Sequence, residues 1–176
     1  PCIYAFDGSA YKELDAYSIN EDHIDTLQNS LRILSGMYGI LRPLDLMQPY
    51  RLEMGTKMQI NGHDRLYDFW GDSLTEALND ELEDNELFVN LASKEYFKAL
   101  QPDKLKVDVI KPKFKDFKNG NLKTIGFYAK KNRGTMARYL IENEVDSYEG
   151  LLGFNGNDYA YSEEHTKDKP EPVFVR

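Results

Sequence analysis

Apolar residues recur every three or four positions in two segments of the chain, a spacing that places side chains on one face of an α-helix. The first segment follows Asn20, a favourable helix N-cap residue, and ends at Gly36. The second covers residues 66–82, the length of a helix of about four turns. The stripes consist of Ile24, Leu27, Leu31 and Leu34 in the first segment and of Leu66, Phe69, Trp70, Leu74, Ala77, Leu78 and Leu82 in the second.

Shorter apolar runs predict β-strands, and a short helix is predicted before Pro102, at residues 94–100. Strands are predicted at residues 2–6, 37–41, 52–58 and 86–91, and residues 159–161 are expected to pair with 173–175. This mixture predicts an α/β or mixed α+β fold, with a mixed, partly antiparallel sheet flanked by helices. No repeat or linker divides the chain, so residues 1–176 are expected to form a single domain.

Residues 111–130 have the pattern of a β-hairpin. Asn119-Gly120 at its centre suits a two-residue type I′ turn, which pairs Lys118 with Asn121. The register then places Phe114 opposite Ile125 on an apolar face. Pro112 and Phe127 pair on that face as well, and Asp116 lies beside Lys123. The other face receives Lys111, Lys113 and Lys115, which we call the lysine ladder, together with Tyr128 and Lys130.

A short amphipathic helix is predicted to start near Asn132, with Lys130, Lys131 and Arg133 at its beginning and acidic residues at its end. This charge order opposes the helix macrodipole, which favours acids in the first turn and bases in the last by about 0.3–1 kcal/mol each. We interpret the reversal as a site for a phosphate or another anion. The alternative is that these cations form ion pairs with acids elsewhere in the chain.

Charge is distributed unevenly along the sequence. Residues 104–138 contain eleven Lys and Arg but only Asp108 and Asp116 as acids, whereas the whole chain has a formal net charge of −8. Such a basic segment in an acidic chain indicates a surface that binds an anion, and nucleic acid is the commonest large one. No apolar run is long enough to cross a membrane. The single Cys2 excludes an internal disulfide.

Motifs of common enzymes are absent from the sequence. There is no P-loop, dinucleotide-binding glycine motif, nucleophile elbow or Cys-x-x-Cys pair, and the three histidines lack metal-ligand spacing. No cofactor and no metal are therefore predicted, and no catalytic residue is assigned. Polar residues do cluster near Asp45, Glu53 and Asp72. One interpretation is that they form buried ion pairs and turns. The other is that these carboxylates lie near a cationic site and act as acid–base groups.

Residues 35–55, which read SGMYGILRPLDLMQPYRLEMG, resemble the signature stretch of the YaaA peroxide-stress-resistance family. Four further blocks resemble that family in the same order. These are FWGD at 69–72, NLASKEYFK at 90–98, FYAKKNRG at 127–134 and LGFN at 152–155. The resemblance covers the whole chain but corresponds to about the C-terminal two thirds of a family member, so an N-terminal segment with a helix-hairpin-helix element is expected to be missing.

The resemblance implies a cytoplasmic bacterial protein that protects against hydrogen peroxide, limits damage linked to iron and binds duplex or branched DNA in a basic cleft. By this resemblance, the DNA-binding role falls to Lys130, Lys131 and Arg133, together with Arg42 and Arg51. We therefore expect sequence-tolerant DNA binding, with phosphates contacted by the lysine ladder and by Lys130, Lys131 and Arg133, and with Tyr128 available to stack on an unpaired base.

Two other functions stay open on the sequence. One is an enzyme that acts on a small phosphorylated or carboxylated substrate, held by the same basic cluster, with Asp45, Glu53 or Asp72 as acid–base groups. The other is an iron-handling protein, although no pattern of two histidines and one carboxylate is present.

Overall fold

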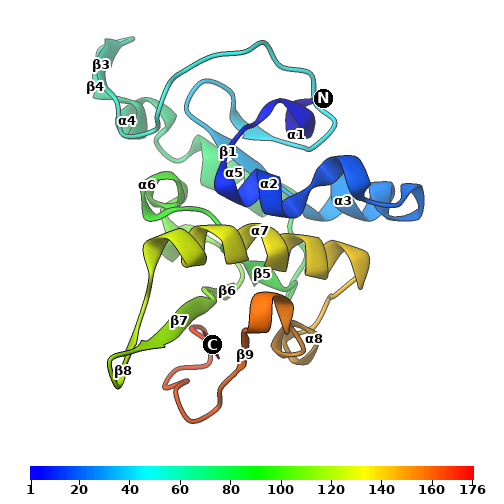
Figure 1. Cartoon of the computed structure of the whole chain (residues 1–176). Helices are drawn as coiled ribbons and strands as arrows, with labels where there is room; N and C mark the ends of the chain where they lie inside the picture. Colours follow the sequence, from blue (N-terminus) through cyan, green and yellow to red (C-terminus); the bar gives the residue numbers. More distant parts are fainter.

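The computed structural model describes residues 1–176 and is organised around one long helix, α7 (Gly126–Glu142). Figure 1 shows α7 running across the middle of the molecule, with α2 (Ser9–Leu14) along one side and the sheet strands β7 and β9 on the other. The N-terminus lies on the α2 side and the C-terminus on the sheet side. The two sides of α7 therefore belong to different parts of the chain.

Most of the remaining helices are short. They are α1 (Cys2–Ala5), α3 (Ile24–Ser30), α4 (Leu66–Trp70), α5 (Ser73–Glu81), α6 (Lys94–Phe97) and α8 (Tyr148–Leu152). Single turns of 3-10 helix cover Ala16–Ser18, Glu21–His23, Lys98–Leu100, Pro102–Lys104 and Gly156–Asp158. None of the helices combines the length and apolarity that crossing a membrane requires.

The strands form one four-stranded sheet and three pairs. The larger sheet has the order β8 (Asn121–Lys123), β7 (Lys113–Lys118), β10 (Val173–Val175), β9 (Ala160–Tyr161), and only β7 and β10 are parallel. The pairs are β1 (Ile33–Ser35) with β2 (Gly39–Leu41), β3 (Lys57–Ile60) with β4 (His63–Arg65), and β5 (Phe88–Val89) with β6 (Val109–Ile110), of which the last is parallel. The predicted mixed α/β class and the pairing of β9 with β10 are confirmed.

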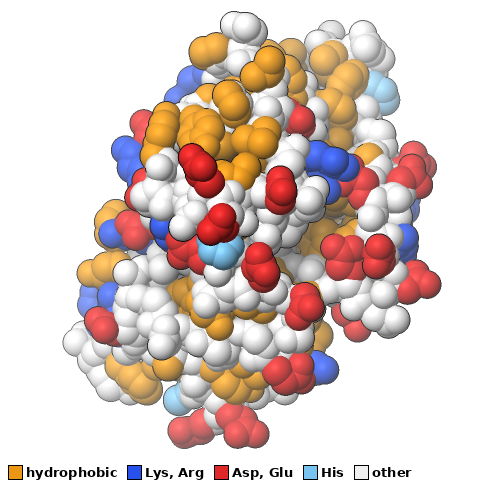
Figure 2. All heavy atoms as spheres, turned by 90° about the vertical axis from the view of Figure 1, so that its right-hand side faces the viewer, with side chains coloured by type: hydrophobic (Ala, Val, Ile, Leu, Met, Phe, Trp, Pro, Cys, Tyr) orange, Lys and Arg blue, Asp and Glu red, His pale blue; other side chains and the backbone are white.

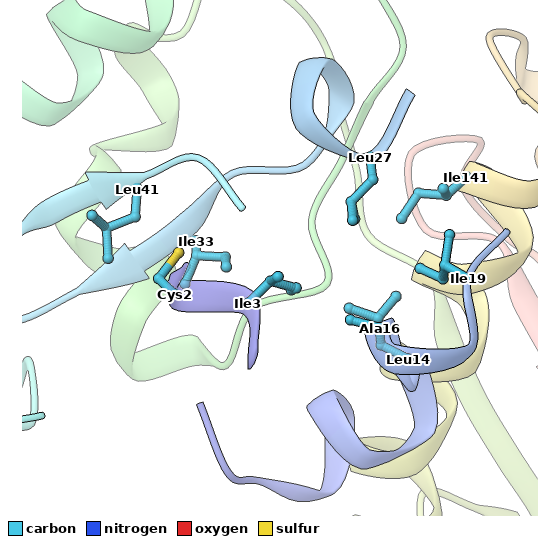
Figure 3. Close-up of a cluster of buried hydrophobic side chains, with 9 residues drawn as sticks. All are labelled: Cys2, Ile3, Leu14, Ala16, Ile19, Leu27, Ile33, Leu41 and Ile141. Carbon is cyan, nitrogen blue, oxygen red and sulfur yellow. The ribbon is translucent and has the colours of Figure 1, made fainter. Parts of the chain in front are cut away.

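Three clusters of buried side chains form the core, and α7 contributes to two of them. Ile141 belongs to the cluster around α1, α2 and α3 that Figure 3 shows. Ala129 and Met136 belong to a second cluster, which α7 forms with the four-stranded sheet and α8. The third surrounds Met54 and the helices α4, α5 and α6. Because α7 joins two clusters, its position affects both.

Helices α2 and α7 approach each other closely at Gly134. A methyl group at this position would overlap the carbonyl oxygen of Ala10 and lie 2.7 Å from its carbonyl carbon. Lys131 Nζ is 2.8 Å from Glu13 Oε1 on α2. The Arg138 guanidinium donates to the backbone oxygens of Leu14, Asp15 and Ser18, which satisfies carbonyls at and beyond the end of α2. The two helices are thus fixed against each other by backbone contact and by two cations.

A strand is predicted at residues 2–6, but residues 2–5 form helix α1 and Phe6 follows it with extended backbone. The amides of Cys2 and Ile3 donate to the carbonyls of Asp45 and Pro43, at 2.8 and 3.0 Å, and no neighbouring strand is available to them. Both side chains enter the core cluster of Figure 3. An apolar run of five residues does not distinguish a strand from a turn of buried helix.

The two predicted long helices are both interrupted. Asn20 does cap the first, since its side chain accepts from the Asp22 amide, but α3 ends at Ser30 and residues 33–35 form β1. The Arg32 guanidinium donates to the carbonyls of Gln28 and Asn29 and so terminates α3. The second helix breaks at Gly71, whose φ of 51° and ψ of −125° suit only glycine and separate α4 from α5.

The hairpin turn is confirmed, whereas the length of its second strand is not. Lys118 pairs with Asn121, and both Asn119 and Gly120 have positive φ, as a type I′ turn requires. Strand β8 ends at Lys123, and α7 begins at Gly126. Phe127, Tyr128 and Lys130 are therefore helical, and the predicted helix start near Asn132 is six residues late. Neither the Phe114–Ile125 pair nor the Pro112–Phe127 pair forms.

Candidate anion-binding site

One face of α7 lines a cavity whose wall includes basic residues. The face consists of Lys130, Arg133, Gly134 and Ala137, spaced at three- and four-residue intervals. The cavity has a volume of about 760 Å³. The opposite face of α7 carries Ala129 and Met136, which are buried against the sheet. The sequence around Arg133 thus turns two basic side chains towards the cavity because its apolar residues occupy the core.

Arg133 has no acidic partner. Its guanidinium makes no ion pair or hydrogen bond within the protein, although the residue is half-buried. Burial lowers the pKa of Arg133, because desolvation disfavours the charged form. An arginine remains charged at neutral pH even so. A partly desolvated, unpaired guanidinium beside an open cavity favours an anionic ligand.

The other walls of the cavity come from five parts of the chain. They are α2 with the preceding Phe6, the segment from Asn29 to Leu34, Glu53, the end of α5, and the segment from Glu86 to Leu100 that includes α6. Eighteen of its 31 lining residues are hydrophobic, and the charged residues of the wall are Lys130, Arg133, Arg32, Glu53, Glu81 and Glu86. A concave, mostly apolar wall that also carries polar side chains is typical of ligand-binding sites.

All three acidic residues of the cavity wall have partners, and Glu86 Oε2 accepts from the Glu83 amide at 2.9 Å. Glu53 Oε2 accepts from the Tyr96 hydroxyl at 3.1 Å, and Glu81 Oε2 accepts from Arg32 at 2.6 and 2.8 Å. Burial, together with the hydrogen bond to Glu53, raises the pKa of Tyr96. Burial also raises the pKa of Tyr11, and the Tyr11 hydroxyl donates no hydrogen bond within the protein. Both tyrosines are therefore neutral at pH 7.

The cations of the 130–134 block differ in their roles. Lys130 is exposed at the cavity and has no ion-pair partner. Lys131 pairs with Glu13 and lies 5.7 Å from the Phe127 ring centre, so its role is to hold α2 against α7. Asn132 is buried; its side-chain NH2 donates to the Tyr128 carbonyl, and its Oδ1 accepts from the side-chain NH2 of Asn157. The expected reversal of the helix charge is wrong, because the first turn of α7 contains no charged residue.

The lysine ladder is divided in the structure. Lys113 and Lys115 alternate with buried Phe114 and Asp116 along β7 and so share a face. Lys113 forms an ion pair with Glu171, in the segment before β10. Lys111 precedes the strand, and its Nζ lies 5.8 Å from the Phe97 ring centre. Lys115 alone of the three has neither an acidic nor an aromatic partner.

Asp116 is the centre of a buried polar cluster and not an exposed residue. It does lie opposite Lys123 in the register, yet it is only 5% exposed. Arg176 donates to Asp116 Oδ1 at 2.7 and 3.0 Å, and the Tyr159 hydroxyl donates to Oδ2 at 2.8 Å. The Arg176 guanidinium also covers Tyr128, 4.2 Å from its ring centre. One face of Tyr128 is thus occupied within the protein.

Arg42 and Arg51 lie apart from the basic residues of α7, and both have acidic partners. Arg42 Nη2 is 3.3 Å from Glu81 Oε2, and Arg51 Nη2 is 3.9 Å from Glu53 Oε1. Neither arginine lines the cavity. Of the three candidate acid–base residues, Glu53 alone does so. Asp45 accepts from the Arg42 amide, and Asp72 pairs with Lys104.

Two aromatic cavity residues, Tyr11 and Phe88, carry no signal in the sequence. Tyr96 lies in the block at 90–98, but the three belong to segments far apart in the chain and meet only in the fold. Spacing along α7 could have identified the pair Lys130 and Arg133, had the helix been predicted to begin at Gly126. No group of three His, Cys, Asp or Glu side chains is arranged to hold a metal ion.

A family model described as peroxide stress protein YaaA matches residues 1–165. The chain belongs to this family. It is 57% identical over 161 residues to a UPF0246 protein of Flavobacterium psychrophilum, a match that covers 92% of the chain and 64% of the relative. UPF0246 proteins of Flavobacterium johnsoniae and a Marinomonas species are each 54% identical over the whole chain, which covers 69% and 67% of their lengths. The chain thus spans about two thirds of these YaaA-family relatives.

Proposed function

We propose that this YaaA-family protein binds DNA in the cytoplasm during the bacterial response to hydrogen peroxide, through sequence-tolerant contacts with backbone phosphates. The observation that carries the proposal is the group of basic residues without acidic partners on the β7–β8 hairpin and the start of α7. These unpaired cations are Lys115, Lys118, Lys123, Lys130 and Arg133. The sequence predicts phosphate contacts by the whole lysine ladder and by Lys131. We now leave out Lys111, Lys113 and Lys131, because each has a partner within the protein.

The elements that carry the unpaired cations are neighbours in the chain and in the fold. Only residues 124 and 125 separate β8 from α7, and Figure 1 places the hairpin and the N-terminal end of α7 on the same side. Figure 2 views the molecule from the opposite side, where acidic side chains outnumber basic ones. Segregation of this kind allows a chain of net charge −8 to approach a polyanion in one orientation.

Salt dependence and matched variants test the proposal. We expect the affinity for a labelled DNA to fall steeply with salt, because each phosphate contact contributes about −0.9 to the slope of log affinity against log salt for duplex DNA. Replacing Lys115, Lys118 and Lys123 with Gln should weaken binding and reduce the slope by about two to three.

The control changes three exposed lysines elsewhere, Lys57, Lys94 and Lys167, to Gln, which alters the net charge by the same amount. None of the three has an ion-pair partner. If the two triple variants bind equally well, the hairpin is not the contact surface and the proposal is wrong.

A second candidate is an enzyme that acts on a small anionic substrate. It is favoured by one observation, namely that Glu53 lines the same cavity as Lys130 and Arg133. A carboxylate near an anion clamp could serve as a general base. Turnover of a phosphorylated or carboxylated compound that is lost in Glu53→Gln, with substrate binding retained, would establish this candidate.

A further inference from the structure

The cavity beside α7 has walls suited to an aromatic ring. Its lining includes Phe6, Tyr11, Phe88, Tyr96 and Phe97. Phe6 and Tyr11 are stacked with ring centres 5.1 Å apart and an angle of 18° between their planes, so the two rings are held nearly parallel in this wall. Flat rings bind other flat rings by stacking, and nucleobases are frequent ligands of such surfaces.

The same cavity has a cationic edge suited to a phosphate. Lys130 and Arg133 lie one helical turn apart on α7, and neither has an acidic partner in the protein. Bidentate donation by an arginine matches the geometry of phosphate oxygens. The desolvation of Arg133 strengthens its interaction with an anion, since less water has to be removed when the ligand binds.

Donors that a base edge could use are also present. Asn90 Oδ1 accepts from the Ala92 amide, and the Asn90 NH2 group donates no hydrogen bond within the protein. The Tyr11 hydroxyl donates no hydrogen bond either, and both residues line the cavity. Donors that have no partner in the protein would be matched by the ring nitrogens and carbonyl oxygens of a base.

We propose that this cavity binds one nucleoside monophosphate unit, with the phosphate on Arg133 and Lys130 and the base against the aromatic wall. A volume of about 760 Å³ accommodates a single nucleotide and falls within the range of small-molecule pockets, roughly 300–1,000 Å³. The unit is either a free nucleotide or an unpaired nucleotide of a DNA strand. The second source rests on the proposed DNA binding, whereas the first does not.

Calorimetric titration of the whole 176-residue chain tests the proposal, with AMP, adenosine, ribose 5-phosphate and inorganic phosphate as probes. We expect AMP to bind more tightly than each of the other three, because only AMP engages both walls. Arg133→Gln should weaken AMP binding by about 10- to 100-fold, the usual effect of losing a hydrogen bond to a charged group.

Lys118→Gln is the matched control, because Lys118 lies at the exposed end of the hairpin and does not line the cavity. It should leave AMP binding unchanged while it weakens DNA binding. Equal affinity for AMP and inorganic phosphate would reduce the site to a simple anion site and overturn the nucleotide assignment. The melting temperature of each variant identifies any effect that is due to unfolding.

Two DNA duplexes distinguish the sources. One is fully paired, and the other contains a single unpaired nucleotide. Preference for the second duplex that is lost in Arg133→Gln would assign the site to an unpaired nucleotide in DNA, and AMP binding without this preference would assign it to a free nucleotide. If the duplexes bind alike and AMP does not bind, the inference fails while the proposed DNA binding stands. If AMP binds but neither duplex does, the proposed DNA binding fails and the inference stands.

Discussion

Gly134→Ala should destabilise the protein, because the backbone of α2 occupies the space that the new methyl group needs. The added carbon would overlap the carbonyl oxygen of Ala10 and lie 2.7 Å from its carbonyl carbon and 2.9 Å from its Cα. Carbon atoms in contact are normally about 3.5–4.0 Å apart, so α2 and α7 would have to separate by roughly 1 Å. The ion pair of Lys131 with Glu13 and the Arg138 hydrogen bonds oppose such a movement.

The expected magnitude follows from two opposing effects. Overpacking of a close contact costs about 1–3 kcal/mol. Alanine in a helix interior is favoured over glycine by about 1 kcal/mol, which offsets part of this cost. Because the overlap is with a backbone carbonyl oxygen, we expect a cost at the upper end of this range and hence a net loss of about 2 kcal/mol in the free energy of unfolding. For a chain of this size, the melting temperature should fall by about 4–8 °C.

Thermal and urea denaturation, followed by circular dichroism, measure this loss. Gly126→Ala is the control, since it lies in the same helix and a methyl group there meets nothing within 4 Å. It should be neutral or slightly stabilising. Ala10→Gly should not rescue Gly134→Ala, because the overlap is with backbone atoms of residue 10. If Gly134→Ala melts at the temperature of the parent, the close approach of α2 and α7 is wrong.

The sequence predicts the parts of the fold that depend on neighbouring residues. Asn119-Gly120 determines the hairpin register, since both residues must adopt positive φ, and the structure has the predicted pair Lys118–Asn121. Asn20 caps a helical segment for a similarly local reason. Such features require no information about distant parts of the chain.

The parts that the sequence does not predict depend on distant contacts. Phe127 and Tyr128 favour a strand by propensity, but α7 begins before them because Ala129 and Met136 pack against the sheet at helical spacing. Asp116 resembles a surface residue until Arg176, sixty positions later in the chain, pairs with it. Propensity is overridden in both cases by tertiary packing.

The candidate site shows the same division. The sequence identifies the 130–134 block as exceptional, but it does not indicate that Lys131 pairs with Glu13, that Gly134 allows two helices to touch, or that Arg133 has no partner. These roles follow from the position of α2, which lies more than a hundred residues earlier in the chain. A sequence block can therefore be functional and structural at once.

Three further changes test the electrostatics. Asp116→Asn should lower the free energy of unfolding in urea by about 1–3 kcal/mol, because it weakens a buried hydrogen-bonded ion pair; an unchanged midpoint would show that the pair contributes nothing. Although burial opposes it, hydrogen bonding by Arg32 lowers the pKa of Glu81, so this carboxylate stabilises the protein at neutral pH and ceases to do so as the pH falls through its lowered pKa. The melting temperature of Glu81→Gln should accordingly lie below that of the parent at pH 7 and approach it below pH 4.5, the ordinary pKa of a glutamate. Finally, Lys131→Gln and Arg133→Gln should shift stability in opposite directions despite equal changes in charge on one helix. Lys131→Gln removes a half-buried ion pair worth about 0.2–1 kcal/mol and should lower the stability. Arg133→Gln removes an unpaired charge that is costly to bury and should raise it. Comparison of the two melting temperatures measures the difference, and a lower value for Arg133→Gln than for Lys131→Gln would show that Arg133 has a structural partner and is not available to a ligand.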